Sequence, residues 1–423
     1  MIKRSLYLLA FILLSMQLSA QDTSYVRQLV DTLSSQHFFG RGYLNQGGNK
    51  AAAYLRDEMK HIGLQPVDDS YLQDFSFRVN TFPADPVLSI NGETYRAGYD
   101  YVMPSDCPSI NGTFPLHILD STVVNDSLRF CDLQKGKYHK RIVVIPVWQI
   151  DEKKQERLVK EKIRNNYLKA KAYIMINDRY TIWSVSTETK KAPVFQFTRD
   201  AFPVEAQTIE LTIKSKIAKT TASNVVGYLP AETGKTIAFT AHYDHLGGIG
   251  KDLYYPGAQD NASGVAMCLD IARYYKSNPP EFNVLIMLFA GEEAGLLGSS
   301  WYVNKPLYPL DSIDFLINLD MAGTGEKGIA IVNAKDSLYT KEREAFIHIN
   351  DSLNLLDDIK CRPVSPNSDH FPFHQKGVKS VFIYSRGGET FYHNPADVSS
   401  SVSLGGYYDI FELITNFLKS YGR

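Results

Sequence analysis

The sequence predicts an α/β protein in which helices flank a mostly parallel, mixed sheet, and in which a β-rich α+β domain is inserted. Beyond residue 222, apolar runs typical of buried strands alternate with stretches of helical spacing. Between residues 73 and 215 the runs are shorter, rich in β-forming residues and separated by turn signals such as Asn91-Gly92. Acid and imidazole residues stand near the ends of several apolar runs in the second half of the chain.

The N-terminus has the three parts of a secretory signal. Lys3 and Arg4 precede an apolar stretch at residues 6–14, and small residues close the segment at Ala20. Cleavage after Ala20 would give an exported protein, periplasmic or extracellular. The apolar stretch is shorter than the roughly 20 residues that a membrane-spanning helix needs, and no later segment is a better candidate. We therefore expect no stable membrane insertion of the mature chain.

Net charge and cysteine content exclude several classes of protein. The net charge is −1, and removal of Lys3 and Arg4 with the signal would leave −3, with no basic run in the chain. Nucleic acid and anionic membranes are therefore not predicted as partners. Four cysteines are too few for a disulfide scaffold. Cys107 and Cys131 could pair in an oxidising compartment, whereas Cys268 lies on an apolar helical face and is predicted to be a buried thiol.

The chain divides into four predicted segments. They are a signal peptide at residues 1–20, an N-terminal part of the main domain at 21–72, the inserted domain at 73–215 and the rest of the main domain at 216–423. Residues 49–62 have helical spacing, and Gly63 stands where that helix should stop. Inside the insert, strands are expected at 141–147, 172–176 and 192–197, and a charged helix at 152–170.

The main domain is expected to alternate strands and helices. Its candidate strands are residues 236–241, 283–290, 313–319 and 380–384. Its candidate helices are residues 262–276, 295–304, 341–354 and 406–420. In open sheets of this kind, ligands bind outside the carboxyl ends of the strands. Polar residues that follow these strands are therefore the first candidates for function.

His242 follows the first of these strands, in Ala241-His242-Tyr243-Asp244-His245. Residues i and i+2 of an extended segment share a side, so Asp244 could orient the ring of His242. A lone histidine after a strand is more often structural than a metal ligand, but here other ligand-type residues stand at comparable positions. We predict His242 as a metal ligand and Asp244 as its support, and interpret His245 as a loop residue.

Asp260 lies just before a predicted helix, in a segment that runs from Gly257 to Gly264. The simplest interpretation is an N-cap, because an aspartate accepts hydrogen bonds from the first free amides of a helix. A carboxylate has two oxygens, however, and could bridge two metals while its neighbours cap the helix. We predict Asp260 as the bridging ligand.

Glu292 and Glu293 come directly after a buried strand. Alone, this segment is best explained as an exposed acidic first turn favoured by the helix dipole. Two adjacent carboxylates are costly to bury unless a positive charge compensates them, and a metal would do so. One glutamate would then ligate the cation, and the other would take a proton from a water whose pKa the metal lowers to about 7.

Asp320 and His393 complete the candidate ligands. Asp320 ends a predicted strand, and His393 lies in Tyr392-His393-Asn394-Pro395. Nitrogen and carboxylate ligands without thiolates suit zinc, with manganese or cobalt as substitutes. A catalytic zinc normally takes three ligands from protein, so a larger set predicts two zinc ions. The predicted ligands are His242, Asp260, Glu293, Asp320 and His393.

The order of these motifs is similar to that of the di-zinc exopeptidase family of secreted bacterial aminopeptidases and glutamate carboxypeptidase. The motifs are His242 with Asp244, residues 257–264 around Asp260, Glu292-Glu293 with Gly295, Asp320, Ser368-Asp369-His370, and Tyr392-His393 with Asp397. The resemblance covers about residues 220–423, and a weaker similarity appears at Gly40-Arg41-Gly42. Residues 73–215 resemble the protease-associated domain that several members insert at this point.

The resemblance implies a role for each site residue. His242 and Asp320 would hold one zinc, Glu293 and His393 the other, and Asp260 would bridge them. Glu292 would be the general base, Asp244 the support of His242, and Tyr392 a residue that stabilises the tetrahedral oxyanion. For Asp369 and His370 a structural role and a catalytic role both stay open.

A secreted zinc aminopeptidase acting on peptides is the function that the resemblance predicts. A carboxypeptidase or dipeptidase of the same family is an alternative, because Arg386 could supply the cation for a terminal carboxylate. Glutaminyl cyclase, a single-zinc acyltransferase of similar fold, and a binding protein on the same scaffold are further alternatives. The complete ligand set and the base argue against both. Side-chain preference, oligomeric state and the role of the insert are not determined by the sequence.

Overall fold

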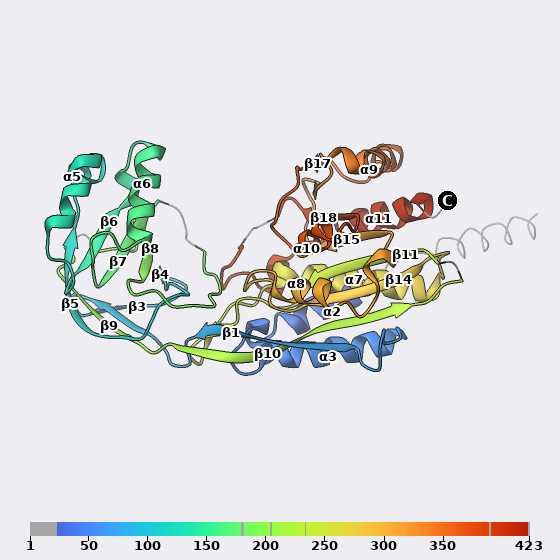
Figure 1. Ribbon diagram of the computed structural model, residues 1–423, viewed down its shortest axis with the longest axis horizontal. Coiled ribbons are helices and arrows are strands. Elements are labelled where there is room, and N and C mark those ends of the chain that lie inside the picture. Colours follow the sequence, from blue (N-terminus) through green and yellow to red (C-terminus); the bar gives the residue numbers. More distant parts are fainter. Residues whose placement is uncertain (1–22, 179–181, 204, 233, 389–390, 422–423) are drawn as a thin grey trace, which may run out of the picture.

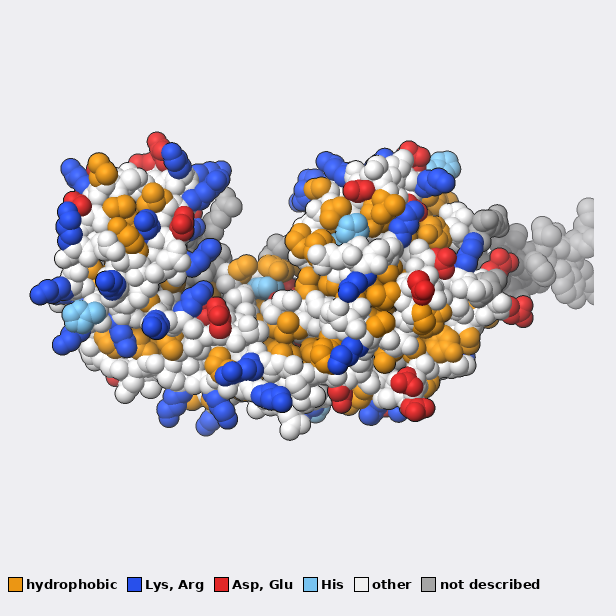
Figure 2. All heavy atoms as spheres, in the orientation of Figure 1, with side chains coloured by type: hydrophobic (Ala, Val, Ile, Leu, Met, Phe, Trp, Pro, Cys, Tyr) orange, Lys and Arg blue, Asp and Glu red, His pale blue; other side chains and the backbone are white. Residues whose placement is uncertain are grey.

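The computed structural model describes residues 23–178, 182–203, 205–232, 234–388 and 391–421. The predicted signal peptide lies outside these residues. No described helix is both long and apolar enough to cross a membrane. The chain forms a larger and a smaller domain joined along one edge (Figure 1), and the space-filling view shows a hollow between the two (Figure 2).

The larger domain is built on an eight-stranded mixed sheet with the order β1-β10-β14-β11-β15-β18-β16-β17. Its strands are β1 (Leu72–Thr81), β10 (Lys216–Leu229), β11 (Thr236–His242), β14 (Asn283–Phe289), β15 (Phe315–Leu319), β16 (Ile329–Val332), β17 (Ile359–Cys361) and β18 (Ser380–Ser385). The four neighbours β14, β11, β15 and β18 are parallel. Every residue of β11 and β15 is buried, because helices cover both faces of the sheet. This is the fold class that the sequence predicts.

Helices cover the two faces of this sheet unequally. They are α2 (Thr23–Leu33), α3 (Gly47–Ile62), α7 (Ser263–Ser277), α8 (Leu297–Asn304), α9 (Thr340–Leu353), α10 (His370–Gln375) and α11 (Tyr407–Tyr421). Residues of α2, α3, α7, α9 and α11 pack in one core cluster with Ile237 and Phe239 of β11. Residues of α8 and α10 pack on the opposite face with Ala238. Gly63 ends α3 with φ of 87°, as the sequence predicts.

The smaller domain has its own eight-stranded sheet, with the order β3-β2-β9-β5-β6-β7-β8-β4. Its strands are β2 (Val87–Ile90), β3 (Glu93–Tyr95), β4 (Tyr101–Val102), β5 (Ile110–Ile118), β6 (Ile142–Pro146), β7 (Ala172–Asn177), β8 (Val194–Thr198) and β9 (Thr208–Ile213). Its helices are α4 (Ser121–Val124), α5 (Ser127–Asp132) and α6 (Lys153–Arg164). A two-stranded sheet, β12 (Gly248–Ile249) and β13 (Leu253–Tyr254), lies in the loop that follows β11.

Short helical turns complete the described elements. They are η1 (Gln36–Arg41), η2 (Leu133–Lys135), η3 (Val147–Gln149), η4 (Ala258–Ala262), η5 (Leu310–Ser312), η6 (Ser337–Tyr339) and η7 (Ser399–Ser401). Two of them matter for the site. The turn η1 carries Arg41, and η4 carries Asp260.

An antiparallel ribbon connects the two domains. All ten residues of β1 pair with β10, from Leu72 opposite Val225 to Thr81 opposite Lys216. The chain therefore leaves the larger domain along one strand of this ribbon and returns along the other. The first strand of the smaller sheet begins only at Val87, so the segment 72–81 belongs to the larger sheet.

The loop between β11 and α7 packs against the smaller domain. Its residues Leu246, Ile249 and Tyr255 lie in the core cluster of that domain. The amide of Gly250 donates to the carbonyl of Phe82 at 2.8 Å. This loop also joins His242 to Asp260, so the interface between the domains lies directly beside the predicted ligands.

The cysteines form no disulfide. Cys107, Cys131, Cys268 and Cys361 are all free thiols, so Cys107 and Cys131 are not paired. Cys268 is buried in α7, and burial raises the pKa of its thiol. It is the buried thiol that the apolar face of this helix predicts.

Gly264, in the first turn of α7, has no room for a side chain. An added Cβ would lie 2.3 Å from Asn261 Oδ1 and 2.3 Å from the carbonyl oxygen of Leu319. We expect Gly264→Ala to destabilise the larger domain by about 1–3 kcal/mol, because the new methyl group must displace packed atoms. Thermal unfolding followed by circular dichroism measures this loss. Gly234→Ala is the control, since no atom would lie within 4 Å of its Cβ; equal midpoints for both variants would contradict the close packing.

Candidate metal centre

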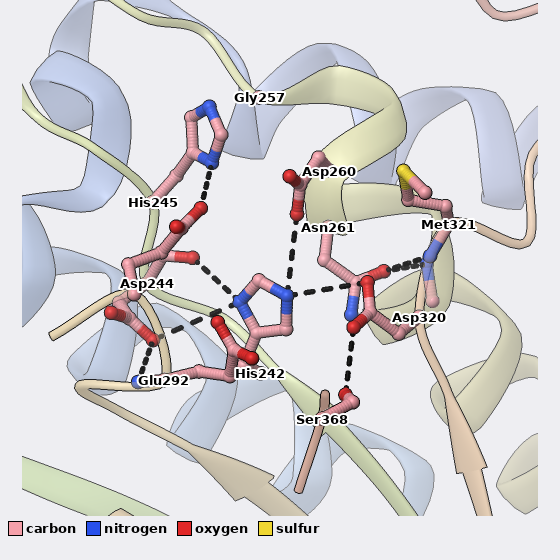
Figure 3. Close-up of polar contacts among 12 residues, drawn as sticks. His242, Asp244, His245, Gly257, Asp260, Asn261, Glu292, Asp320, Met321 and Ser368 are labelled. Atoms are coloured by element: carbon pink, nitrogen blue, oxygen red, sulfur yellow. Dashed lines mark hydrogen bonds and ion pairs between the residues drawn. The ribbon is translucent and has the colours of Figure 1, made fainter. Parts of the chain in front are cut away.

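The predicted site residues meet at the carboxyl edge of the parallel strands. His242 is the last residue of β11, Asp320 follows β15, and Glu292 and Glu293 follow β14 closely. His393 lies in the loop after β18. Figure 3 shows His242 at the centre of this group, with Asp260, Asp320 and Glu292 around its ring.

Asp260 lies between the two predicted histidine ligands. Its Oδ1 is 3.3 Å from Nε2 of His242, and its Oδ2 is 3.2 Å from Nε2 of His393. Each imidazole also faces a second carboxylate: Asp320 Oδ1 lies 3.3 Å from His242 Nε2, and Glu293 Oε2 lies 3.2 Å from His393 Nε2. The arrangement is two similar ligand groups that share one carboxylate.

Backbone carbonyls orient both rings. Nδ1 of His242 lies 3.0 Å from the carbonyl oxygen of Asp244, and Nδ1 of His393 lies 2.8 Å from that of Trp183. Because a carbonyl only accepts, each Nδ1 carries a hydrogen, and each Nε2 is directed at the acids. The carboxylate of Asp244 lies farther from this ring, at 3.8 Å. It accepts instead from the amide of Glu292 at 3.1 Å and from the hydroxyl of Tyr43 at 3.3 Å.

Other polar groups hold the carboxylates in place. Ser368 donates its hydroxyl hydrogen to Asp320 Oδ2 at 2.7 Å and accepts from the amide of Asn318 at 2.8 Å. Asp397 accepts hydrogen bonds from the backbone amides of Gln259 and Asp260, at 2.8 Å and 3.1 Å. Ser368 and Asp397 both belong to motifs seen in the sequence, and both act through residues that face the site.

The residues after Asp260 begin helix α7. The side chain of Asn261 accepts from the amides of Gly264 and Met321, at 3.0 Å and 2.9 Å, and donates to the carbonyl of Leu319 at 3.0 Å. Asn261 therefore serves the start of α7 and ties it to the loop that carries Asp320. The carboxylate of Asp260 is left free to face the imidazoles, as it would need to be in a bridging ligand.

Arg41 is a fully buried cation beneath the site. Its guanidinium donates to five backbone carbonyls, those of Leu33, Tyr243, Pro256, Gly257 and Asp260, at 2.6–3.3 Å. Its flanking residues must be small, because a Cβ on Gly40 or Gly42 would lie within 2.4 Å of Gly247. Burial lowers the pKa of Arg41 to about 10, against the raising effect of Asp397 and Asp260. It stays charged at neutral pH.

The protonation of the ligand groups follows from their mutual attraction. Burial works against a charged His393, but Glu293 and Asp260 raise its pKa to about 11. Burial and Asp260 would raise the pKa of Glu293, but His393 and His245 hold it at about 2. Without a metal, these imidazoles are therefore cations and their partners anions. A divalent cation among them would displace the protons on Nε2 and would itself compensate the negative charge of the carboxylates.

Glu292 behaves differently from Glu293. Burial raises the pKa of Glu292 well above its ordinary value, His242 opposes the rise, and Glu293 adds to it. Its carboxylate lies outside the two ligand groups that Asp260 joins. A carboxyl group with a raised pKa beside a metal site is suited to accept and return a proton.

His245 is a buried neighbour of the site that sequence reasoning placed in a loop. Its Nδ1 donates to Glu293 Oε1 at 2.8 Å, and its ring is fully buried. It also lies within reach of a cation held by Asp260 and Glu293. No periodic pattern in the sequence marks it, because its partner is 48 residues away.

The remaining predicted residues lie at the margins of the site. Tyr392 is 44% exposed and stacks on His393, with ring centroids 3.8 Å apart. Asp369 and His370 are buried, and burial raises the pKa of Asp369 to about 7. Arg386 pairs with Asp358 instead of facing the ligands.

A cavity of about 150 Å³ opens onto the ligands. Besides His242, Asp260, Glu292, Asp320, Tyr392 and His393, it is lined by Met321, Asn367, Phe382 and Tyr384. The lining therefore combines acids and imidazoles with Met321 and aromatic side chains. None of the described lining residues is a lysine or an arginine.

The donor set fits a pair of divalent cations. His242, Asp260 and Asp320 converge in one group of three. Asp260 and Glu293 converge with His245 in a second group, and Nε2 of His393 lies 3.2 Å from both of these carboxylates. Arg41 is the only buried arginine or lysine among the described residues. Nitrogen and carboxylate donors without thiolates are typical of zinc.

Comparison with known proteins agrees with this geometry. Residues 224–418 match the family model described as "Peptidase family M28". This part of the chain is therefore similar to that peptidase family. The match covers all of the predicted ligands and Glu292 and leaves out the inserted domain.

Relatives extend the likeness beyond this domain. Aminopeptidase YwaD of Bacillus subtilis is 31% identical over 267 residues, which are 58% of this chain and 56% of that protein. The match thus spans about half of the relative's length. The structure of a zinc aminopeptidase from Bacillus subtilis has a TM-score of 0.67 at 20% identity, covering 95% of both chains. A peptidase M28 precursor from Shewanella amazonensis has a TM-score of 0.68 at 16% identity, covering 96% of this chain and 94% of its own. At such identities the likeness concerns the fold.

Arg41 offers a test of the framework that holds the site. Removing a buried charge from its hydrogen-bonded partners costs roughly 3–5 kcal/mol, so we expect Arg41→Leu to reduce the free energy of unfolding by at least about 3 kcal/mol. Urea unfolding measures the difference. Arg27→Leu is the matched control, because Arg27 also donates to two carbonyls, those of Ser399 and Val402, but is only partly buried. A loss for Arg41→Leu no larger than for Arg27→Leu would contradict the role of the buried cation.

Proposed function

We propose that this protein is an exported, zinc-dependent aminopeptidase that removes residues from the N-terminus of peptides. The observation that carries the proposal is Asp260, whose two oxygens face two histidines of separate ligand groups. The peptidase family of residues 224–418 and the aminopeptidase named among the relatives support it. The signal-like N-terminus supports export.

The proposed zinc ions would be held by residues already in position. His242 and Asp320 would hold one, Glu293 and His393 the other, and Asp260 would bridge them. When bound, the pair would polarise the scissile carbonyl and lower the pKa of a water to about 7.

The side chains of the protein would perform the proton transfers. Glu292 would accept a proton from the attacking water and return it to the leaving amine. The hydroxyl of Tyr392 would donate a hydrogen bond to the oxyanion of the substrate. The carbonyl of Asp244 would keep Nε2 of His242 directed at the site, and the carboxylate of Asp244 would hold the backbone of Glu292.

The cavity favours an aminopeptidase over a carboxypeptidase. None of the described residues that line the cavity is a lysine or an arginine, the cations that would pair with a terminal carboxylate. A terminal carboxylate would need a cation, and the one predicted for it, Arg386, is engaged by Asp358. Met321, Phe382 and Tyr384, which line the same cavity, would receive an apolar first side chain.

Glu292→Gln tests the catalytic base. The variant keeps the shape of the site but loses the group that moves the proton, so we expect kcat to fall by about 10²–10⁴ while two zinc ions remain bound. Hydrolysis of leucine p-nitroanilide and elemental analysis of the purified variant measure the two quantities. Glu344→Gln is the control, because Glu344 is exposed on α9. Near-normal turnover of Glu292→Gln would disprove this role.

A paired substrate assay tests which end of the peptide is cut. We expect zinc-dependent hydrolysis of free-amino substrates such as leucine p-nitroanilide and none of the corresponding N-acetylated dipeptides, since blocking removes the free α-amino group that an aminopeptidase requires. A chelator should abolish the activity, and added zinc should restore it. Cleavage of only the blocked substrates would favour a carboxypeptidase. Cyclisation of an N-terminal glutamine peptide without hydrolysis would favour a glutaminyl cyclase.

A further inference from the structure

The smaller domain contributes directly to the orientation of a predicted metal ligand. Nδ1 of His393 donates to the carbonyl of Trp183 at 2.8 Å, and the amide of Trp183 lies 3.4 Å from the carbonyl of His393. Trp183 is 210 residues away in the sequence and belongs to the inserted domain. The ring of His393 therefore takes its tautomer from a different domain than the one that carries it.

The segment that supplies this carbonyl is held firmly on the smaller domain. The Ser186 carbonyl accepts from the amide of Asn80, in strand β1 of the connecting ribbon, at 2.8 Å, and on the smaller domain the hydroxyls of Ser184 and Ser105 lie 3.1 Å apart. Trp183 itself is only 5% exposed and lies in the core cluster of that domain. The carbonyl therefore has little freedom to move while the segment stays packed.

The ring of Trp183 also packs on the loop that leads to Asp260. It stacks on Tyr255, with centroids 4.7 Å apart and planes inclined by 17°. Tyr255 precedes Asp260 by five residues in the loop between β11 and α7. Trp183 thus contacts two loops of the peptidase domain, one carrying His393 and the other Asp260.

We propose that Trp183 is a positioning residue through which the inserted domain completes the zinc centre and controls its affinity for metal. The proposal rests on the proposed function, since it assigns His393 to a zinc ion. Docking of the domain places the Trp183 carbonyl, the carbonyl fixes the hydrogen on Nδ1 of His393, and Nε2 is left free to bind. Without this support the ring of His393 can rotate or exchange tautomers. Zinc binding must then order the ring, which lowers the affinity for zinc.

The coupling must work in both directions. If docking of the smaller domain raises the affinity for zinc, then zinc must stabilise the docked position by the same factor. Zinc should therefore protect the amides of residues 182–187 from hydrogen exchange, although none of these residues is a predicted ligand. Amides of β9, on the far side of the smaller sheet from β8, should not change.

Two variants separate positioning from general stability. Trp183→Ala keeps the backbone carbonyl but removes the indole that packs its segment against Tyr255, so we expect it to weaken the binding of one of the two zinc ions by about 10–100-fold, the usual effect of disturbing a partner that orients a ligand. Trp183→Phe should restore most of the affinity, because the indole Nε1 has no hydrogen-bond partner among the described residues and the stacking surface is retained. Trp148→Ala is the control; Trp148 lies in the same domain, partly buried, but stacks on Arg199.

Competition with a chromophoric chelator measures both zinc affinities, and hydrogen exchange of the wild-type chain with and without zinc needs no variant. Weakened binding in Trp183→Ala alone, with zinc-dependent protection of residues 182–187, supports the proposal. Equal affinities in Trp183→Ala and the wild type, or no change in protection, would overturn it. If the wild-type chain itself binds no zinc, the proposed function fails as well, so the two failures are distinguishable.

Discussion

The attraction between buried carboxylates and the positive charges among them is the interaction on which the rest of this site depends. Asp260, Glu293 and Asp320 lie close together in a region almost closed to water, where unpaired anions would be very costly. The two imidazoles compensate them directly, and Arg41 compensates them from beneath while holding five carbonyls of the surrounding loops. A pair of divalent cations would also compensate these negative charges and would in addition activate a water for hydrolysis.

The parallel strands explain why these groups meet at all. The ends of β11, β14, β15 and β18 lie side by side, so loops that are far apart in the chain leave the sheet at one edge. A strand end alone does not fix a side chain, however. Ser368, Asn261 and Asp397 hold the carboxylates and the loops around them through hydrogen bonds. The parallel strands bring the ligand residues to one edge of the sheet, and these hydrogen bonds then fix the positions of their side chains.

The inserted domain adds a second level of control. It is connected through the ribbon of β1 and β10, but it also packs against the loop between β11 and α7 and reaches His393 through Trp183. The predicted ligand His393 therefore lies beside the place where the two domains meet. Under the proposed role of Trp183, a domain without predicted ligands would influence metal binding.

The sequence by itself determined the fold class, the four central strands, most of the helices that cover them and the types of residue at the candidate site. These features follow from local patterns: apolar runs, helical spacing, stop signals such as Gly63, and acids or histidines after buried strands. Only the tertiary structure decided how Asp260 divides its two oxygens, that Arg41 holds five carbonyls, that His245 contacts Glu293, and that Trp183 supports His393. Such contacts join residues up to about two hundred positions apart, and no periodicity of the chain records which side chains a folded sheet brings together.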